Sequence, residues 1–256
     1  MCTVFFAWQS RKDLPLIVAS NRDEFHQRPT SAAAWQADGL WFGGRDEKDG
    51  GSWLGIAKSG RFAVITNFRD PENIKQVAPS RGDLVRRWLE GEEQEVFCNH
   101  LESAAEDYNG FNLMFGDTAQ LYYFGSAISP AKVQTLAPGL YGLSNGVLDE
   151  AWPKVKLGKR RFETVVGAEE VGFDVLRGLM SDRRKAPDEA LPNTGVPREW
   201  ESLLSSLFIV SPAYGTRATT VFTLSNSGQS EFIETRFDST GEVTGQTQEA
   251  FAISHV

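Results

Sequence analysis

Cysteine and histidine are scarce in this sequence, with two cysteines and three histidines among 256 residues. Cys2 and Cys98 are too few for a disulfide framework, and neither lies in a metal-binding spacing such as Cys-x-x-Cys. The histidines are scattered along the chain, which gives a zinc site little support. We therefore expect no metal site and no required cofactor.

Long apolar runs and an excess of positive charge are also missing. No run approaches the roughly 20 apolar residues that a membrane-spanning helix needs. The first ten residues do not place a basic segment before an apolar one, as a secretory signal does. The net charge of -8 provides no basic field to displace counterions from phosphates. These absences favour a cytoplasmic protein with no transmembrane segment and no nucleic acid partner.

Strand-like patterns gather at both ends of the chain, and helical patterns fill the middle. Hydrophobic residues make up 41% of the sequence, which is enough for a substantial core. The predicted strands are Cys2–Trp8, Leu14–Ser20, Ser52–Ala57, Arg61–Asn67, Phe111–Phe115, Gln120–Phe124, Ala218–Leu224 and Glu231–Phe237, with one more after Gly241. The predicted helices are Ser80–Leu89, Glu92–Leu101, Pro153–Phe162, Val171–Met180 and Arg198–Leu207. Ser80 followed by Asp83 resembles a capping box at the first of these helices.

Hairpins at both ends of the chain with helices between them exclude a simple parallel βαβα sheet. They suit an α+β fold in which two antiparallel sheets pack together and are covered by helices. The sequence shows no internal repeat and no break in composition, so residues 1–256 are predicted to form a single domain.

Cys2 is the first residue that suggests chemistry. Methionine before a small residue is normally removed, and its removal would make Cys2 the terminal residue. The thiol, with a pKa near ~8.5, would then have its own α-amine, with a pKa near ~8, as a base. A small residue that begins an edge strand is the structural alternative, and position alone favours it.

Several polar or glycine-rich segments follow or interrupt the predicted strands. Turns and solvated surface are the ordinary explanation for them. In the functional explanation, the hairpin returns residues 20–24 beside Cys2, where a carboxylate could hold the α-amine and a guanidinium could stabilise a thiolate. Asn67 and Asn145, which end strand-like runs, could donate to an oxyanion. The glycine-rich residues 43–55 suit a loop that lines a cavity, but they match neither nucleotide-binding glycine pattern.

Together these segments resemble the NRDE family, also called the TANGO2 (transport and Golgi organization 2) family. The matching segments are Met1-Cys2-Thr3, Asn21-Arg22-Asp23-Glu24, Gly43-Gly44-Arg45-Asp46, Gly50-Gly51-Ser52-Trp53-Leu54-Gly55, Thr66-Asn67-Phe68-Arg69, Leu143-Ser144-Asn145 and Gly215-Thr216-Arg217. They occur in order across nearly the whole chain. The family looks like a branch of the N-terminal-nucleophile hydrolases, near the choloylglycine hydrolases that cleave amide bonds. The resemblance therefore implies a four-layer α/β/β/α sandwich.

The resemblance also implies roles for individual residues. Cys2 would be the nucleophile and Asp23 the partner of its α-amine, Asn67 and Asn145 would contribute to the oxyanion hole, and Arg217 would lie beside the thiolate. The candidate substrate-binding residues are Asn21, Arg22, Arg45, Trp53 and Arg69. The choloylglycine pattern has Arg-Asn-x-Asp after the second strand, whereas here Ser20 occupies the arginine position and Arg22 is shifted.

Two functions from different classes fit these features. The first is a cysteine hydrolase that acts on a small non-peptide amide C–N bond. The alternative is a binding or trafficking protein for haem or for a lipid or acyl-CoA-type hydrophobic ligand, a function to which eukaryotic members of the family have been linked. Trp35, Trp41 and Trp53 could line its cavity, and Cys2 could ligate haem iron. A scaffold whose polar motifs only build turns is a third interpretation.

Overall fold

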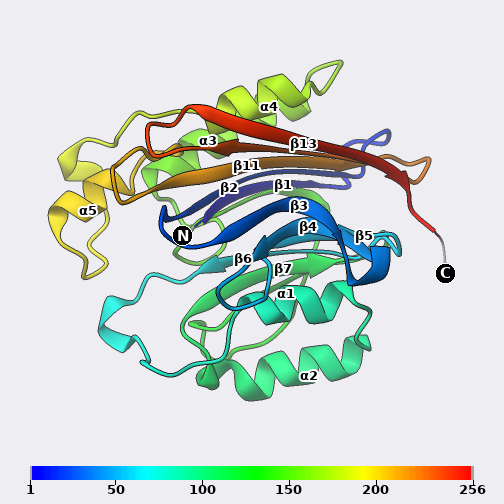
Figure 1. Ribbon diagram of the computed structural model, residues 1–256, viewed down its shortest axis with the longest axis horizontal. Helices are drawn as coiled ribbons and strands as arrows, with labels where there is room; N and C mark the ends of the chain where they lie inside the picture. The colour runs from blue at the N-terminus through cyan, green and yellow to red at the C-terminus, as the bar shows by residue number, and fades with distance from the viewer. Residues whose placement is uncertain (1, 255–256) are drawn as a thin grey trace.

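Two antiparallel sheets face each other in the computed structural model, which describes residues 2–254 (Figure 1). The first sheet has the strand order β10-β1-β2-β11-β12-β13, and the second has the order β3-β4-β5-β6-β7-β8-β9. The strands are β1 (Cys2–Trp8), β2 (Leu16–Phe25), β3 (Thr30–Gln36), β4 (Trp41–Asp46), β5 (Leu54–Ala57), β6 (Phe62–Asn67), β7 (Phe111–Gly116), β8 (Leu121–Gly125), β9 (Gln134–Leu136), β10 (Gly139–Leu143), β11 (Tyr214–Leu224), β12 (Gln229–Phe237) and β13 (Val243–Ala252).

Helices cover the outer faces of both sheets. The helices are α1 (Gly82–Leu89), α2 (Gln94–Ala104), α3 (Pro153–Val166), α4 (Phe173–Met180) and α5 (Arg198–Leu203). Helices α3 and α4 pack on the first sheet, and α1 packs on β5 and β6 of the second, with α2 beside it (Figure 1). The α+β four-layer sandwich predicted from the sequence is therefore confirmed. No helix within residues 2–254 is both long and apolar enough to cross a bilayer.

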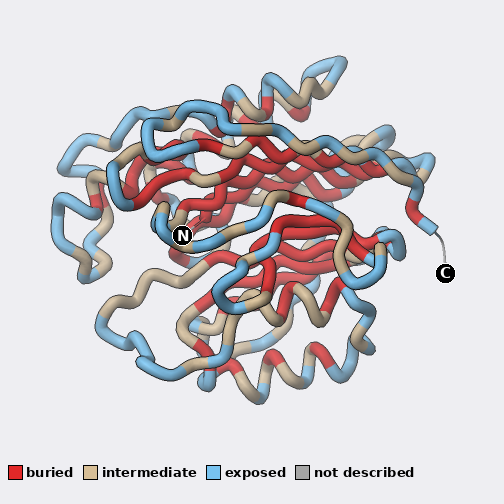
Figure 2. The backbone as a smooth tube through the Cα atoms, in the orientation of Figure 1, coloured by how far each residue is buried: buried red, intermediate tan, exposed pale blue. Residues whose placement is uncertain are grey.

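Strand β1 is buried on both faces because it lies between the second sheet and the helices. Successive side chains of a strand point to opposite faces. Val4 and Phe6 accordingly join the core between the sheets, and Phe5 and Ala7 join the core under α3 and α4. Figure 2 shows that burial is concentrated in the sheets, while loops and the outer sides of helices are exposed.

Most predicted elements are confirmed, including all five helices and the hairpin of β1 and β2. Two expectations are wrong. Residues 20–24 belong to β2 instead of following it, and Gly43 to Asp46 lie in β4 instead of a loop. The glycines of β4 serve close packing, since a Cβ at Gly43 would lie 2.5 Å from the carbonyl oxygen of Leu54.

Candidate functional site

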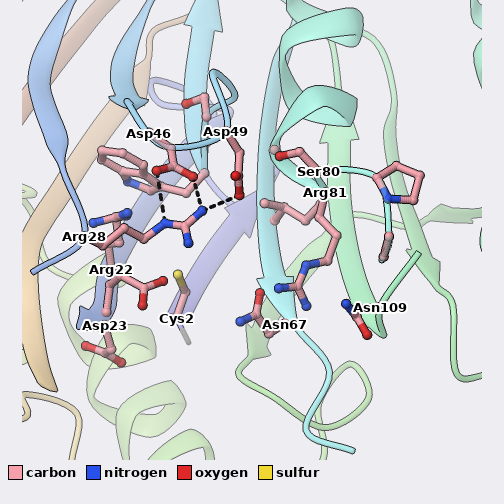
Figure 3. Close-up of a pocket in the computed structure, with 17 residues that line it drawn as sticks. Cys2, Arg22, Asp23, Arg28, Asp46, Asp49, Asn67, Ser80, Arg81 and Asn109 are labelled. Carbon is pink, nitrogen blue, oxygen red and sulfur yellow. Dashed lines mark hydrogen bonds and ion pairs between the residues drawn. The ribbon is translucent and has the colours of Figure 1, made fainter. Parts of the chain in front are cut away.

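Cys2 lies at the start of β1 and lines a cleft of about 400 Å³ where the ends of the two sheets meet (Figure 3). The register of the hairpin places Cys2 opposite Arg22 of β2. Both residues therefore point to the inner face of the first sheet, as the alternation of side chains requires. Three other residues named from the sequence, Asp23, Trp53 and Asn67, line the same cleft.

Cys2 is 7% exposed. Burial raises its pKa, and the negative charge of Asp23 adds to this effect, whereas the guanidinium of Arg22 opposes it. The neutral thiol is therefore the main form near neutral pH, and attack on a carbonyl requires a base that removes the proton. The predicted removal of Met1, which would supply that base, concerns a residue outside the described part of the chain.

Asp23 is held in a fixed position beneath the cleft. The Thr216 hydroxyl donates a hydrogen bond to its Oδ1 atom at 2.7 Å, and the Tyr214 hydroxyl donates to its backbone oxygen at 2.9 Å. Burial raises the pKa of the Asp23 carboxyl to about 6, against the opposing effect of the Lys154 ammonium. A small change near this carboxyl can therefore change its charge at physiological pH.

Lys154 is a buried cation that the sequence did not reveal. It lies in the first turn of α3, is 5% exposed, and its Nζ atom has no hydrogen-bond partner within residues 2–254. Burial lowers the pKa of Lys154 to about 8, and the Asp23 carboxylate opposes this shift. The surrounding sequence has a lysine or arginine at many positions. This pattern is typical of a solvated helix face and does not indicate that Lys154 is buried.

Asn67 and Asn145 have different positions. Asn67 ends β6 and lines the cleft, whereas Asn145 is fully buried behind it. The Asn145 Nδ2 atom donates to the backbone oxygen of Asn67 at 2.8 Å, and the backbone nitrogen of Arg69 donates to the backbone oxygen of Asn145 at 2.7 Å. Asn145 thus holds the backbone at Asn67, and only Asn67 presents its amide to the cleft.

Arg22 and Trp53 form one wall of the cleft. The Arg22 guanidinium carbon lies 4.3 Å from the centre of the Trp53 ring, which is a cation–π contact. The ring packs directly over Gly44, where a Cβ would lie 2.1 Å from a ring carbon. The second glycine of the Gly-Gly-Arg-Asp motif, Gly44, is therefore required for the Trp53 ring to pack in this position.

Arg217 does not line this cleft. It lies in a bulge of β11, between Thr216 and Ala218, and lines a separate cleft. Its Nη1 atom donates to the backbone oxygens of Phe25, His26 and Arg28 at 3.0, 3.0 and 3.2 Å. The structure therefore places Arg217 where it supports the chain after β2, away from the sulfur.

Three other predicted residues also lie outside the cleft. Asn21 points to the helical face of the first sheet and donates to the backbone oxygens of Met180 and Leu207 at 2.8 and 2.9 Å. Arg69 forms a buried salt bridge with Glu201 at 2.7 Å. Arg45 is exposed on β4. Asn21 and Arg69 thus connect distant segments, and neither side chain reaches the cleft in this structure.

Two arginines that sequence reasoning missed do line the cleft, Arg28 and Arg81. Arg28 forms salt bridges with Asp46 and, at 2.6 Å, with Asp49 (Figure 3). Arg81 enters from the other side, at the start of α1. Arg81 lies in the predicted helix Ser80–Leu89 and Arg28 lies in no predicted element, so their approach to Cys2 depends on the tertiary fold.

The tryptophans do not form a shared cavity. Trp53 lines the cleft, whereas Trp41 is buried in the core between the sheets and Trp35 packs against that core. Within residues 2–254, no group of three or more histidine, cysteine, aspartate or glutamate side chains is arranged to hold a metal ion.

Comparison with known sequences identifies relatives along nearly the whole chain. The family model described as Transport and Golgi organisation 2 matches residues 1–239. The Transport and Golgi organization protein 2 homolog of Bos taurus is 34% identical, with 91% of this chain and 92% of that protein covered. The Drosophila melanogaster Transport and Golgi organization protein 2 is 32% identical, with 91% of each chain covered.

Comparison with solved structures gives the fold. The N-acylethanolamine-hydrolyzing acid amidase ortholog of Caenorhabditis elegans aligns with a TM-score of 0.52 at 12% identity, over 86% of this chain and 92% of that one. The C2A mutant of conjugated bile acid hydrolase from Clostridium perfringens aligns with a TM-score of 0.52 at 10% identity, over 99% and 92% of the two chains. The fold is therefore that of the N-terminal-nucleophile hydrolases.

Proposed function

The chain belongs to the Transport and Golgi organisation 2 family, and from this premise we propose that it is a cysteine hydrolase that cleaves a small non-peptide amide. The observation that carries the proposal is that Cys2, Asp23 and Asn67, which are distant in sequence, line one cleft. The two solved structures compared above are described as an acid amidase and a conjugated bile acid hydrolase, which supports the reaction class by analogy.

The proposed reaction begins with the removal of Met1, which frees the α-amine of Cys2. The amine accepts the thiol proton as the sulfur bonds to the amide carbonyl carbon. The side-chain amide of Asn67 donates to the resulting oxyanion, and Asp23 orients the ammonium. The C–N bond then breaks, and the ammonium returns its proton to the leaving amine.

A water molecule completes the cycle. The free α-amine removes a proton from the water, whose oxygen attacks the thioester carbonyl carbon. The carbon–sulfur bond breaks, the thiol regains a proton, and a carboxylic acid is released. Because burial raises the pKa of the thiol, each attack by sulfur depends on the amine.

A chain whose amine is blocked tests the central step. An N-terminal extension would place a protease site directly before Cys2, so that Cys2 becomes terminal only after cleavage. Intact mass would report which form is present. We expect labelling by an acylating thiol probe, and turnover of a panel of N-acyl amides, only after cleavage. Equal labelling and turnover before and after cleavage would contradict the proposal.

The second free cysteine provides a matched control. Cys98 lies in α2 and does not line the cleft. Cys98→Ala should therefore keep both labelling and turnover, whereas Cys2→Ala should lose both. Labelling that persists in Cys2→Ala at the N-terminal peptide would exclude Cys2 as the nucleophile.

The hydrophobic-ligand alternative predicts different behaviour. Most residues that line the cleft are polar or charged, which favours a polar amide over haem. A haem titration followed by absorbance, repeated with Cys2→Ala, separates the two functions. A haem absorbance shift that requires Cys2, in a protein that cleaves no amide, would favour the binding function.

A further inference from the structure

The charges that line the cleft come from two groups of elements. The four carboxylates, of Asp23, Glu24, Asp46 and Asp49, come from β2, β4 and the turn after β4, and the guanidiniums of Arg22 and Arg28 lie on the same side. The opposite wall comes from β6, the start of α1 and the loops beside them. Its residues are Ile65, Asn67, Ala78, Pro79, Ser80, Arg81, Gly82 and Asn109. Arg81 is the one charged residue of this wall, and Cys2 lies between the two sides (Figure 3).

The guanidinium of Arg81 is not neutralised by an adjacent carboxylate. Its Nη1 atom donates to the backbone oxygen of Gly110 at 3.1 Å, and no carboxylate within residues 2–254 forms a salt bridge with it. The nearest acidic residue in sequence, Asp83, instead pairs with Arg86 at 2.6 Å. The remaining N–H groups of Arg81, which is partly buried, face the cleft, where an anionic group of a ligand can replace water as their acceptor.

Arg81 is held in place by tight backbone packing. A Cβ at Gly51 would lie 2.4 Å from the carbonyl carbon of Gly82, and a Cβ at Gly82 would lie 2.9 Å from the backbone oxygen of Ser52. The start of α1 is thereby fixed against the glycine-rich segment. This packing gives Arg81 a defined position opposite the sulfur, as a binding residue needs.

We propose that Arg81 binds an anionic group, a carboxylate, on the substrate that Cys2 attacks. The substrate is then an N-acyl amide with a carboxylate on its acyl or its amine part. Guanidinium binds carboxylate through two parallel hydrogen bonds, and Ser80 lies beside Arg81 as a further polar contact, whereas the Asn109 amide is bound to the backbone of Lys75. This inference rests on the proposed hydrolase function, since it names the substrate class for the same cleft.

Equilibrium binding of two matched probes tests the anionic subsite without requiring turnover. Benzoate and benzamide have the same ring and nearly the same shape but differ in charge. Their binding to Cys2→Ala protein would be measured by ligand-observed NMR. We expect benzoate to bind about tenfold or more tightly than benzamide, because a charged hydrogen bond at a desolvated site has this effect.

Substitutions at Arg81 and at a nearby arginine test whether the preference for benzoate over benzamide depends on Arg81. Arg81→Gln should reduce it to about equal binding, and Arg81→Lys should keep part of it. Arg86→Gln is the matched control, because Arg86 lies in α1 outside the cleft, and it should keep the preference. Equal binding of the two probes, including no measurable binding of either, or a preference that survives Arg81→Gln, would overturn the inference. Benzoate binding through Arg81 in a protein that cleaves no amide would leave the anionic subsite intact and refute the hydrolase.

Discussion

The substitution Asp23→Asn should make the protein more stable near neutral pH and abolish the reactivity of Cys2. Asparagine has the shape of aspartate and can still accept the hydrogen bond from Thr216. It has no charge, however, and so cannot hold the α-ammonium. Where a catalytic group destabilises the folded protein, its replacement should increase stability and decrease activity.

The size of the effect follows from the pKa of Asp23, which burial raises to about 6. In the unfolded chain an aspartate has a pKa of about 4. The folded protein therefore binds the proton more tightly, and the contribution of Asp23 to stability is lost as the pH rises through 6. About two pKa units correspond to about 3 kcal/mol at a site this buried. Lys154, with a pKa of about 8, stays charged over most of this range and does not change the sign.

Urea denaturation of both proteins between pH 4 and pH 7, with the N-terminal extension left in place so that Cys2 carries no α-ammonium, would measure this difference. The free energy of unfolding of Asp23→Asn, relative to that of the wild type, should rise by about 2 to 3 kcal/mol across this range. Taking the difference between the two proteins removes the contribution of most other titrating groups. A difference that does not change with pH would refute the reasoning, as would one that favours the wild type at pH 7.

The remaining predictions concern the lysine beneath the cleft and the glycine under its tryptophan. Lys154→Met removes the cation that opposes the raised pKa of Asp23, so the acid limb of the pH profile of Cys2 labelling should move roughly one pH unit higher. An unchanged profile would mean that the ammonium does not act on Asp23. Gly44→Ala should destabilise the protein by about 1 to 3 kcal/mol in urea, because its Cβ would lie 2.1 Å from the Trp53 ring. Gly178→Ala is the matched control, since nothing lies within 4 Å of its Cβ, and it should be neutral or slightly stabilising.

The arrangement of layers could be predicted from the sequence because the apolar patterns are strong. Alternation and short polar turns identify β1 and its hairpin, and helical periodicity identifies all five helices. The strands that were not predicted, β3, β4 and β9, are short or poor in β-branched residues, and β10 was recognised only as a strand-like run that ends at Asn145. Strand β3 contains three consecutive alanines and β4 two glycines, so their pairing depends on neighbouring strands more than on local preference.

The candidate site was only partly predictable. The motif residues Cys2, Arg22, Asp23, Trp53 and Asn67 do line one cleft, because β1, β2, the glycine-rich segment and β6 end at the same edge. The polarity of a motif residue does not show, however, to which face of the sheet its side chain points. On a strand, alternate side chains point to opposite faces, so adjacent residues of one motif can lie in the cleft or under the helices.

The residues that were missed lie in segments whose local patterns indicate solvent. The sequence around Arg81 predicts a helix start capped by Ser80, yet no side chain caps α1, and the arginine turns into the cleft. Lys154 is followed by several further basic residues, and it is buried where α3 packs against the first sheet and α4. When tertiary contacts bury a single charged residue, the hydrophobic periodicity of the sequence around it does not change, so one sequence does not reveal the burial.

The positions of the buried charges bear on the choice between a catalytic site and a scaffold. Arg22, Asp23 and Lys154 are each at most 5% exposed, and the first two lie at the end of β2 beside Cys2. The other end of the same strand, from Leu16 to Ala19, is entirely apolar. A scaffold would gain stability from apolar residues of similar volume at these three positions, because isolated buried charges are costly and well-packed apolar groups are not. Two further buried carboxylates, Glu201 and Glu234, each form a salt bridge with an arginine elsewhere. Three buried charges near one thiol are what a proton-transfer site requires, and this favours chemistry at Cys2 over a purely structural role for the motifs.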